Sequence, residues 1–99
     1  MANADLAEAE DALARGQAAR ADGGPQAAIY DLERAAAEVK GALAPKVIVE
    51  LVRCLIASGR EQEAIKWCRG KAWRDEAEVI FWRAQALAQH CAAMPVRPG

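Results

Sequence analysis

The sequence is poor in the residues that enzymes commonly use for chemistry. It contains one histidine, His90, one serine, Ser58, and no threonine. Nucleophilic catalysis needs a thiol or hydroxyl beside a base, with a third group that orients the base. His90 precedes Cys91 directly, and adjacent residues on a helix point in different directions, so they do not form a catalytic pair. No Gly-rich phosphate loop compensates, because Gly23-Gly24-Pro25 lacks the lysine and the preceding strand. We therefore expect no enzymatic activity.

Cysteine is also scarce, and its three positions, Cys54, Cys68 and Cys91, are widely spaced. No Cys-x-x-Cys pair is present, and a single histidine adds little to the set of metal ligands. The pattern predicts neither a zinc site nor a disulfide framework, and we expect no cofactor. We interpret the cysteines as small buried hydrophobic residues in a reducing cytoplasm.

Long apolar runs are missing, because no stretch approaches the ~18 consecutive apolar residues of a membrane span. Residues 1–10 lack the basic start and apolar core of a secretory signal. We expect a cytoplasmic protein without a membrane span. The formal net charge is −1, but residues 1–50 carry 5 basic and 9 acidic side chains whereas residues 51–99 carry 8 and 5. Such polarity can orient a partner or favour self-association.

Alanine is what the sequence has in abundance. It fills 25 of the 99 positions, whereas Leu, Ile, Val and Phe together fill 19. Alanine is the strongest helix former, and no window shows the alternation and turn signals of paired strands. The composition therefore predicts an all-α fold in which closely packed helices surround a thin core of large side chains.

Glycine and proline divide the chain into five predicted helices, and the short turns between them make consecutive helices antiparallel neighbours. We expect a single domain over residues 1–94 and a tail over 95–99. The helices are expected from Asn3 or Asp5 to about Arg20, from Pro25 to a stop at Gly41, from Pro45 to Ala57, from Glu61 to about Arg69, and from an Asp75/Glu78 capping box to about residue 93.

The third and fifth helices show the clearest apolar faces. In the third, apolar residues from Val47 to Ile56 cover a wide stripe, which is typical of a helix between neighbours. In the fifth, Ile80, Ala84, Leu87 and Cys91 recur at helical spacing and predict the inward face.

A self-comparison reveals a repeat with a step of 36 residues. The segment GREQEAIKWC that starts at Gly59 aligns with GGPQAAIYDL that starts at Gly23. One further step pairs Leu51 with Leu87 and Leu55 with Cys91. A period of about 34–36 residues with two helices per unit indicates stacked helix hairpins.

On these residues the chain resembles the tetratricopeptide repeat (TPR) family, whose units pair two helices through small residues and a turn glycine. The resemblance spans about residues 9–93 and implies two and a half repeats in a short solenoid. Val52 and Lys71 depart from the motif, where the family has small residues. The matching residues are Gly16, Gly23, Ala28, Leu32 and Ala35 in the first unit, Leu51, Leu55, Gly59 and Ala64 in the second, and Leu87, Ala88 and Cys91 in the third.

The resemblance implies a concave groove that binds a peptide or a helix. Family members that hold a terminal carboxylate use Lys and Asn, whereas this chain offers Arg53 as the single cation at those positions, which favours an apolar peptide or an amphipathic helix. The alternative is that these positions are surface without a ligand. The implied groove residues are Leu13, Gln17, Val49, Arg53, Ile56, Trp82, Gln85 and Gln89.

We expect an adaptor or chaperone without catalytic activity, and the Ala/Arg-rich composition is typical of a GC-rich bacterial genome. One alternative is a self-associating scaffold. Another, less favoured because the pI is about 5.8, is nucleic-acid binding through a basic and aromatic patch. Among its aromatic residues, Trp67 is out of phase with the apolar face and is expected to be partly exposed. That patch comprises Arg60, Lys66, Trp67, Arg69, Lys71, Trp73 and Arg74.

Overall fold

The computed structural model describes residues 2–93 of the chain, with side chains over residues 7–92, and this part contains five helices and no strand. The predicted all-α fold is thereby confirmed. The helices are α1 (Ala2–Ala21), α2 (Gln26–Glu38), α3 (Leu43–Ala57), α4 (Glu61–Cys68) and α5 (Ala77–Ala93).

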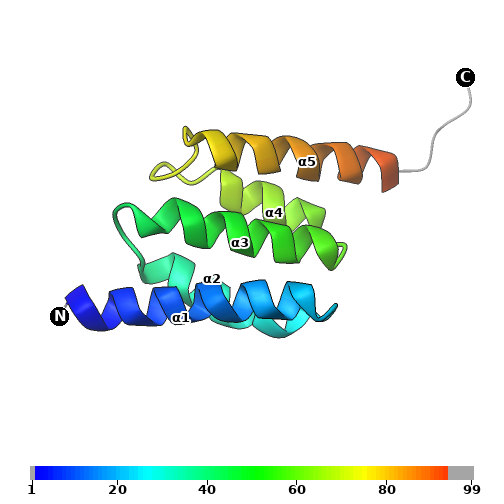
Figure 1. Ribbon diagram of the computed structural model, residues 1–99. Helices are drawn as coiled ribbons and strands as arrows, with labels where there is room; N and C mark the ends of the chain where they lie inside the picture. The colour runs from blue at the N-terminus through cyan, green and yellow to red at the C-terminus, as the bar shows by residue number, and fades with distance from the viewer. Residues whose placement is uncertain (1, 94–99) are drawn as a thin grey trace, which may run out of the picture.

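The helices form two layers with α3 at the centre. α1, α3 and α5 lie side by side in one row, and α2 and α4 lie behind them (Figure 1). α3 packs against each of the other four helices, whereas α1 and α5 do not touch within the described residues. Each helix contacts the next one along the chain, and α3 in addition contacts α1 and α5.

The core follows from the central position of α3. Val47, Ile48, Leu51, Val52 and Leu55 are all fully buried, which confirms that this helix lies between neighbours. The flanking helices contribute smaller side chains, such as Ala12 from α1 and Ala64 from α4. The alanines allow the helix axes to approach closely, so a few large residues are enough to fill the interior.

Two turns show that the 36-residue repeat has a structural counterpart. Gly23 and Gly59 both adopt a positive φ, of 81° and 77°, which is easy for glycine because it has no Cβ. In both turns the next residue donates its N–H to a carbonyl five positions back, from Gly24 to Ala19 and from Arg60 to Leu55. Both α1 and α3 therefore end in a Schellman-type turn.

Several predicted helix boundaries shift by one to three residues. α1 already includes Asn3 and Asp5, and α2 ends at Glu38, three residues before Gly41, because Val39 is extended. α3 begins at Leu43, so Pro45 lies inside its first turn, where no N–H is needed. α5 begins at Ala77 rather than at Asp75, and the predicted tail lies outside the described residues.

The predicted inward face of α5 is wrong. Ile80 is 45% exposed and Leu87 is 42% exposed, and Ala84 and Cys91 are exposed as well. The residues that α5 buries are Val79 and Ala86, with Trp82 packed against the core. Because α5 carries apolar residues on two opposite faces, its periodicity alone does not identify the face that meets the core.

The outcome for the cysteines is mixed. Cys54 and Cys68 are buried as expected, but Cys91 is exposed, because it lies on the outward face of α5. Among the described residues, no helix combines the length and the hydropathy that crossing a membrane requires.

Candidate functional site

The predicted groove residues lie on the row formed by α1, α3 and α5, and they differ widely in exposure. Gln17 and Gln89 are exposed, and Leu13, Arg53, Trp82 and Gln85 are partly buried. Val49 and Ile56 are 7% and 8% exposed and belong to the core. These two side chains therefore offer little surface to a partner, and the polar and aromatic positions carry most of the accessible area.

The structure brings two of the predicted residues into direct contact. The Arg53 guanidinium carbon lies 4.8 Å from the centre of the Trp82 ring, so a cation–π pair joins α3 to α5. Phe81 meets the same indole edge-on, with ring centres 5.2 Å apart. The indole is thus held between a cation and a second aromatic ring while part of it stays accessible.

A buried ion pair next to this cluster was not predicted from the sequence. Glu50 of α3 is 3% exposed. Arg20 of α1 donates two hydrogen bonds to the Glu50 carboxylate, from Nε to Oε2 at 2.5 Å and from Nη2 to Oε1 at 3.0 Å. The hydrogen bond with Glu50 raises the pKa of Arg20 further above its ordinary value. The available signal was a single carboxylate inside the apolar run of the third helix, which calls for a buried cation.

Gly16 makes room for this ion pair. A Cβ at Gly16 would lie 2.7 Å from Glu50 Cγ and 2.9 Å from Leu32 Cδ1, closer than packed carbon atoms allow. The Cys54 thiol lies on the same carboxylate, with Sγ 3.6 Å from Oε2. Burial is the main reason that the pKa of Cys54 rises to about 12, so this thiol is a packing residue and not a nucleophile.

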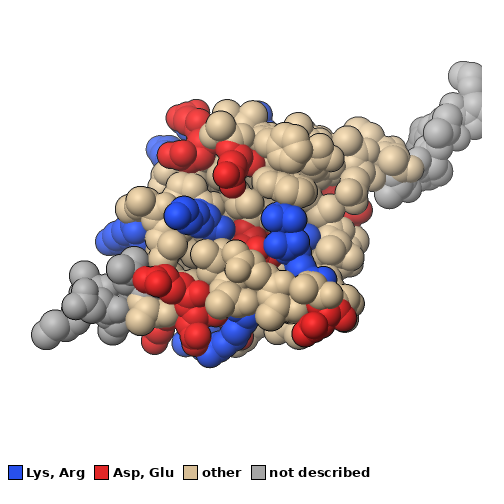
Figure 2. Space-filling model, in the orientation of Figure 1, with Lys and Arg blue, Asp and Glu red and all other residues tan. Residues whose placement is uncertain are grey.

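Positive charge gathers in the middle of the face that Figure 2 shows, over α3, while acidic side chains lie along α1 and near the start of α5. Arg20 of α1 is neutralised by Glu50. The cations that α3 adds to this face are Lys46, which is exposed, and Arg53. They are seven residues apart and therefore lie on the same side of the helix. This face combines two cations, an accessible indole and the amides of Gln17 and Gln85.

The predicted basic and aromatic patch is partly neutralised. Arg60 donates from Nε and Nη2 to the two carboxylate oxygens of Glu63, each at 2.6 Å. Trp73 donates its indole N–H to the Trp67 carbonyl at 2.5 Å. Both indoles are partly buried and pack against the core, which confirms the partial exposure predicted for Trp67. They border a cavity of ≈ 380 Å³. Lys66, Arg69, Lys71 and Arg74 are exposed.

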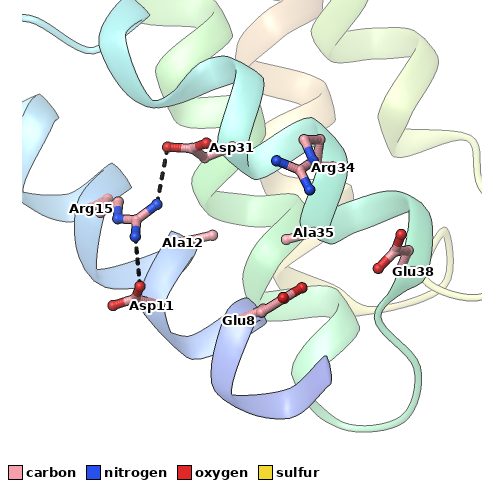
Figure 3. A pocket seen from close by; sticks show the side chains of 8 residues that line it. All are labelled: Glu8, Asp11, Ala12, Arg15, Asp31, Arg34, Ala35 and Glu38. Carbon is pink, nitrogen blue, oxygen red and sulfur yellow. Dashed lines mark hydrogen bonds and ion pairs between the residues drawn. The ribbon is translucent and has the colours of Figure 1, made fainter. Parts of the chain in front are cut away.

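A second cavity, of ≈ 180 Å³, lies between α1 and α2 and is strongly charged (Figure 3). Arg15 binds Asp11 of the same helix at 2.7 Å and Asp31 of α2 across the cleft at 3.2 Å. Arg34, Glu8 and Glu38 line the rest. Within the described residues no three His, Cys, Asp or Glu side chains form a metal-binding group, and this cleft holds no nucleophile beside a base.

Comparison with known proteins leaves the chain without an assigned family, since no family model, no curated protein and no solved structure matches it.

Proposed function

We propose that this protein is a non-catalytic interaction module of the TPR type, an adaptor or chaperone that binds a peptide or helix of a partner across the α1/α3/α5 face. The observation that carries the proposal is the accessible Arg53–Trp82 pair on this face. Tryptophan and arginine are the residues most enriched at the energetic centres of protein interfaces.

The chemistry of the face defines the segment that it suits. The Trp82 ring offers apolar contact, and Arg53 and Lys46 offer positive charge on the same side of α3. The flanking glutamines can hydrogen-bond to a peptide backbone or to polar side chains. We therefore propose a partner segment that presents an apolar side chain next to a carboxylate, in keeping with the helix or extended peptide that the family resemblance implies.

A displayed library of random peptides tests this proposal. Peptides selected on the immobilised protein are synthesised, and their affinities are measured by fluorescence anisotropy. We expect the selected peptides to combine apolar and acidic residues, and Arg53→Glu to weaken binding at least about tenfold, equivalent to ~1.4 kcal/mol.

Arg34 provides the matched control, because it lies over the Tyr30 ring at 5.8 Å on α2, in the other layer. Arg34→Glu removes the same kind of pair and should leave peptide affinity unchanged. The proposal fails if no peptide binds above background, or if the two charge reversals weaken binding equally.

A further inference from the structure

The outward face of α5 carries a continuous apolar stripe, which we define as Ala77, Ile80, Phe81, Ala84, Leu87, Ala88 and Cys91. All seven side chains are exposed, and the three largest, Ile80, Phe81 and Leu87, are 45%, 54% and 42% accessible. At 100° per residue the stripe lies opposite the face that contains Val79 and Ala86. Soluble proteins seldom expose contiguous apolar surface that is not used for association.

From the pattern of this stripe we propose that it binds a second copy of the same chain, with the two α5 helices packed antiparallel around Ala84. Along the centre of the stripe lie Ala77, Ala84 and Cys91, all small and seven residues apart. The three large residues lie at its two edges, with Ile80 and Leu87 on one edge and Phe81, followed by the small Ala88, on the other. A row of small residues between larger edges lets two helix axes approach closely.

The stripe is complementary to itself in this arrangement. A two-fold axis at Ala84 places Ile80 of one copy beside Leu87 of the second copy on one edge. On the other edge it places Phe81 beside Ala88 of the second copy, so a large ring meets a small side chain. Such an isologous contact uses each pair twice, which is how a closed dimer forms.

The polar groups beside the stripe are compatible with a second copy. Glu76, which directly precedes α5, and His90 are fourteen residues apart on the Ile80 side, so the antiparallel arrangement brings Glu76 of one copy to the level of His90 of the second copy. Within one chain the His90 ring lies 3.5 Å from the Gln62 amide of α4. Glu76 is exposed and His90 is partly exposed. Arg83 lies on the same side, is partly buried like His90, and is close enough to Cys68 of α4 to influence its thiol.

Mass measurement by light scattering after size exclusion provides the first test. The wild-type chain at high micromolar concentration should show twice its 10.6 kDa mass, and Leu87→Lys should raise the dissociation constant more than about 100-fold. Tyr30→Lys is the control, because Tyr30 is a large exposed hydrophobic residue on α2, 68% accessible, outside the stripe. A wild-type monomer, or a Leu87→Lys dimer of unchanged affinity, overturns the proposal and assigns the stripe to another occupant.

Crosslinking tests the direction of the helices. In the antiparallel arrangement the two Cys91 residues lie about 21 Å apart along the axis, from fourteen residues at 1.5 Å. A short bis-maleimide should therefore not join wild-type chains through Cys91, but should join Ala84→Cys chains in a Cys91→Ala background. Crosslinking of wild-type chains through Cys91 would overturn the antiparallel arrangement. Because Leu87 lies on the edge of the stripe opposite Phe81, which is the stripe residue that contacts Trp82, Leu87→Lys should leave peptide binding intact.

Discussion

The two ends of the row of helices carry opposite kinds of surface, charged at α1/α2 and apolar at α5. At the N-terminal end, the cleft between α1 and α2 is lined by charged side chains, and Arg15 binds one carboxylate on its own helix and one across the cleft. At the C-terminal end, α5 presents Ile80, Phe81 and Leu87 to the outside. A polar outer face closes the array in stacked-hairpin proteins. In this chain the charged side chains lie at the α1/α2 end and the exposed apolar ones at α5.

The 36-residue step shows why the apolar end is informative. Ala44, Ile48, Leu51 and Leu55 of α3 are buried, whereas the residues 36 positions later are Ile80, Ala84, Leu87 and Cys91, and all four are exposed. The same face of two equivalent helices is thus covered in α3 and open in α5. What differs is the presence of neighbours, because α3 packs against four helices and α5 against two.

Truncation of the equivalent leucines should expose this difference most strongly. Leu51 is fully buried, so Leu51→Ala should lower the free energy of unfolding by about 2–5 kcal/mol through lost contacts and a cavity. Leu87→Ala should cost less than about 1 kcal/mol when measured at low micromolar concentration, because Leu87 is 42% exposed and loses less buried area than Leu51. Urea unfolding followed by tryptophan fluorescence measures both values. Similar losses would mean that α5 buries Leu87 in solution.

Two arginines at the N-terminal end sharpen the comparison further. Arg20→Ala leaves the Glu50 carboxylate buried without its partner and should cost roughly 3 kcal/mol. Arg15→Ala should cost at most about 1 kcal/mol, although Arg15 binds two carboxylates, because its side chain is 57% exposed and water screens the pairs. Thermal and urea unfolding of both variants give the comparison. Equal losses would contradict the distinction between a buried and a surface ion pair.

The sequence predicts the helices better than the surfaces between them. Helices are local, so turn glycines such as Gly59 and the apolar run of the third helix were enough to predict all five helices and the central position of α3. The wrong face of α5 has a definite cause. Both of its faces are apolar, and the choice between them depends on long-range packing through Trp82, which adjacent residues do not encode.

In the candidate site, too, local pattern predicted some residues, whereas a contact between distant residues was missed. The repeat positions of Arg53 and Trp82 placed both residues in one implied groove, and in the structure they form a cation–π pair between α3 and α5. The Arg20–Glu50 pair was missed, because its partners are 30 residues apart and Arg20 resembles any surface arginine near a helix end. Glu50, in an otherwise apolar run, was the residue that indicated a buried charge.

Thiol reactivity gives the smallest expected effect on stability, and it compares the covered interior, which contains Cys54 and Cys68, with the open face of α5, which contains Cys91. At pH 8 an aromatic disulfide should label Cys91 quickly. Cys54 and Cys68 should react only on unfolding, since burial raises the pKa of Cys54 to about 12 and that of Cys68 to about 11. Because the pKa of each thiol is raised in the folded state, the two neutral thiols make their full contribution to the free energy of unfolding below a pH of about 9. This contribution is lost as the pH rises toward 11–12, so Cys54→Ala should reduce the alkaline loss of stability.

Cys91 reports on the open end in the same experiment. If a second copy covers the stripe, the labelling rate of Cys91 should fall as protein concentration rises, and Leu87→Lys should abolish that dependence. Cys54 and Cys68 serve as internal controls, because their protection comes from the fold of the single chain and does not depend on concentration. A Cys91 rate that stays constant over the concentrations tested would mean that the apolar end remains in water, and the contrast between the two ends would then be a property of the isolated chain alone.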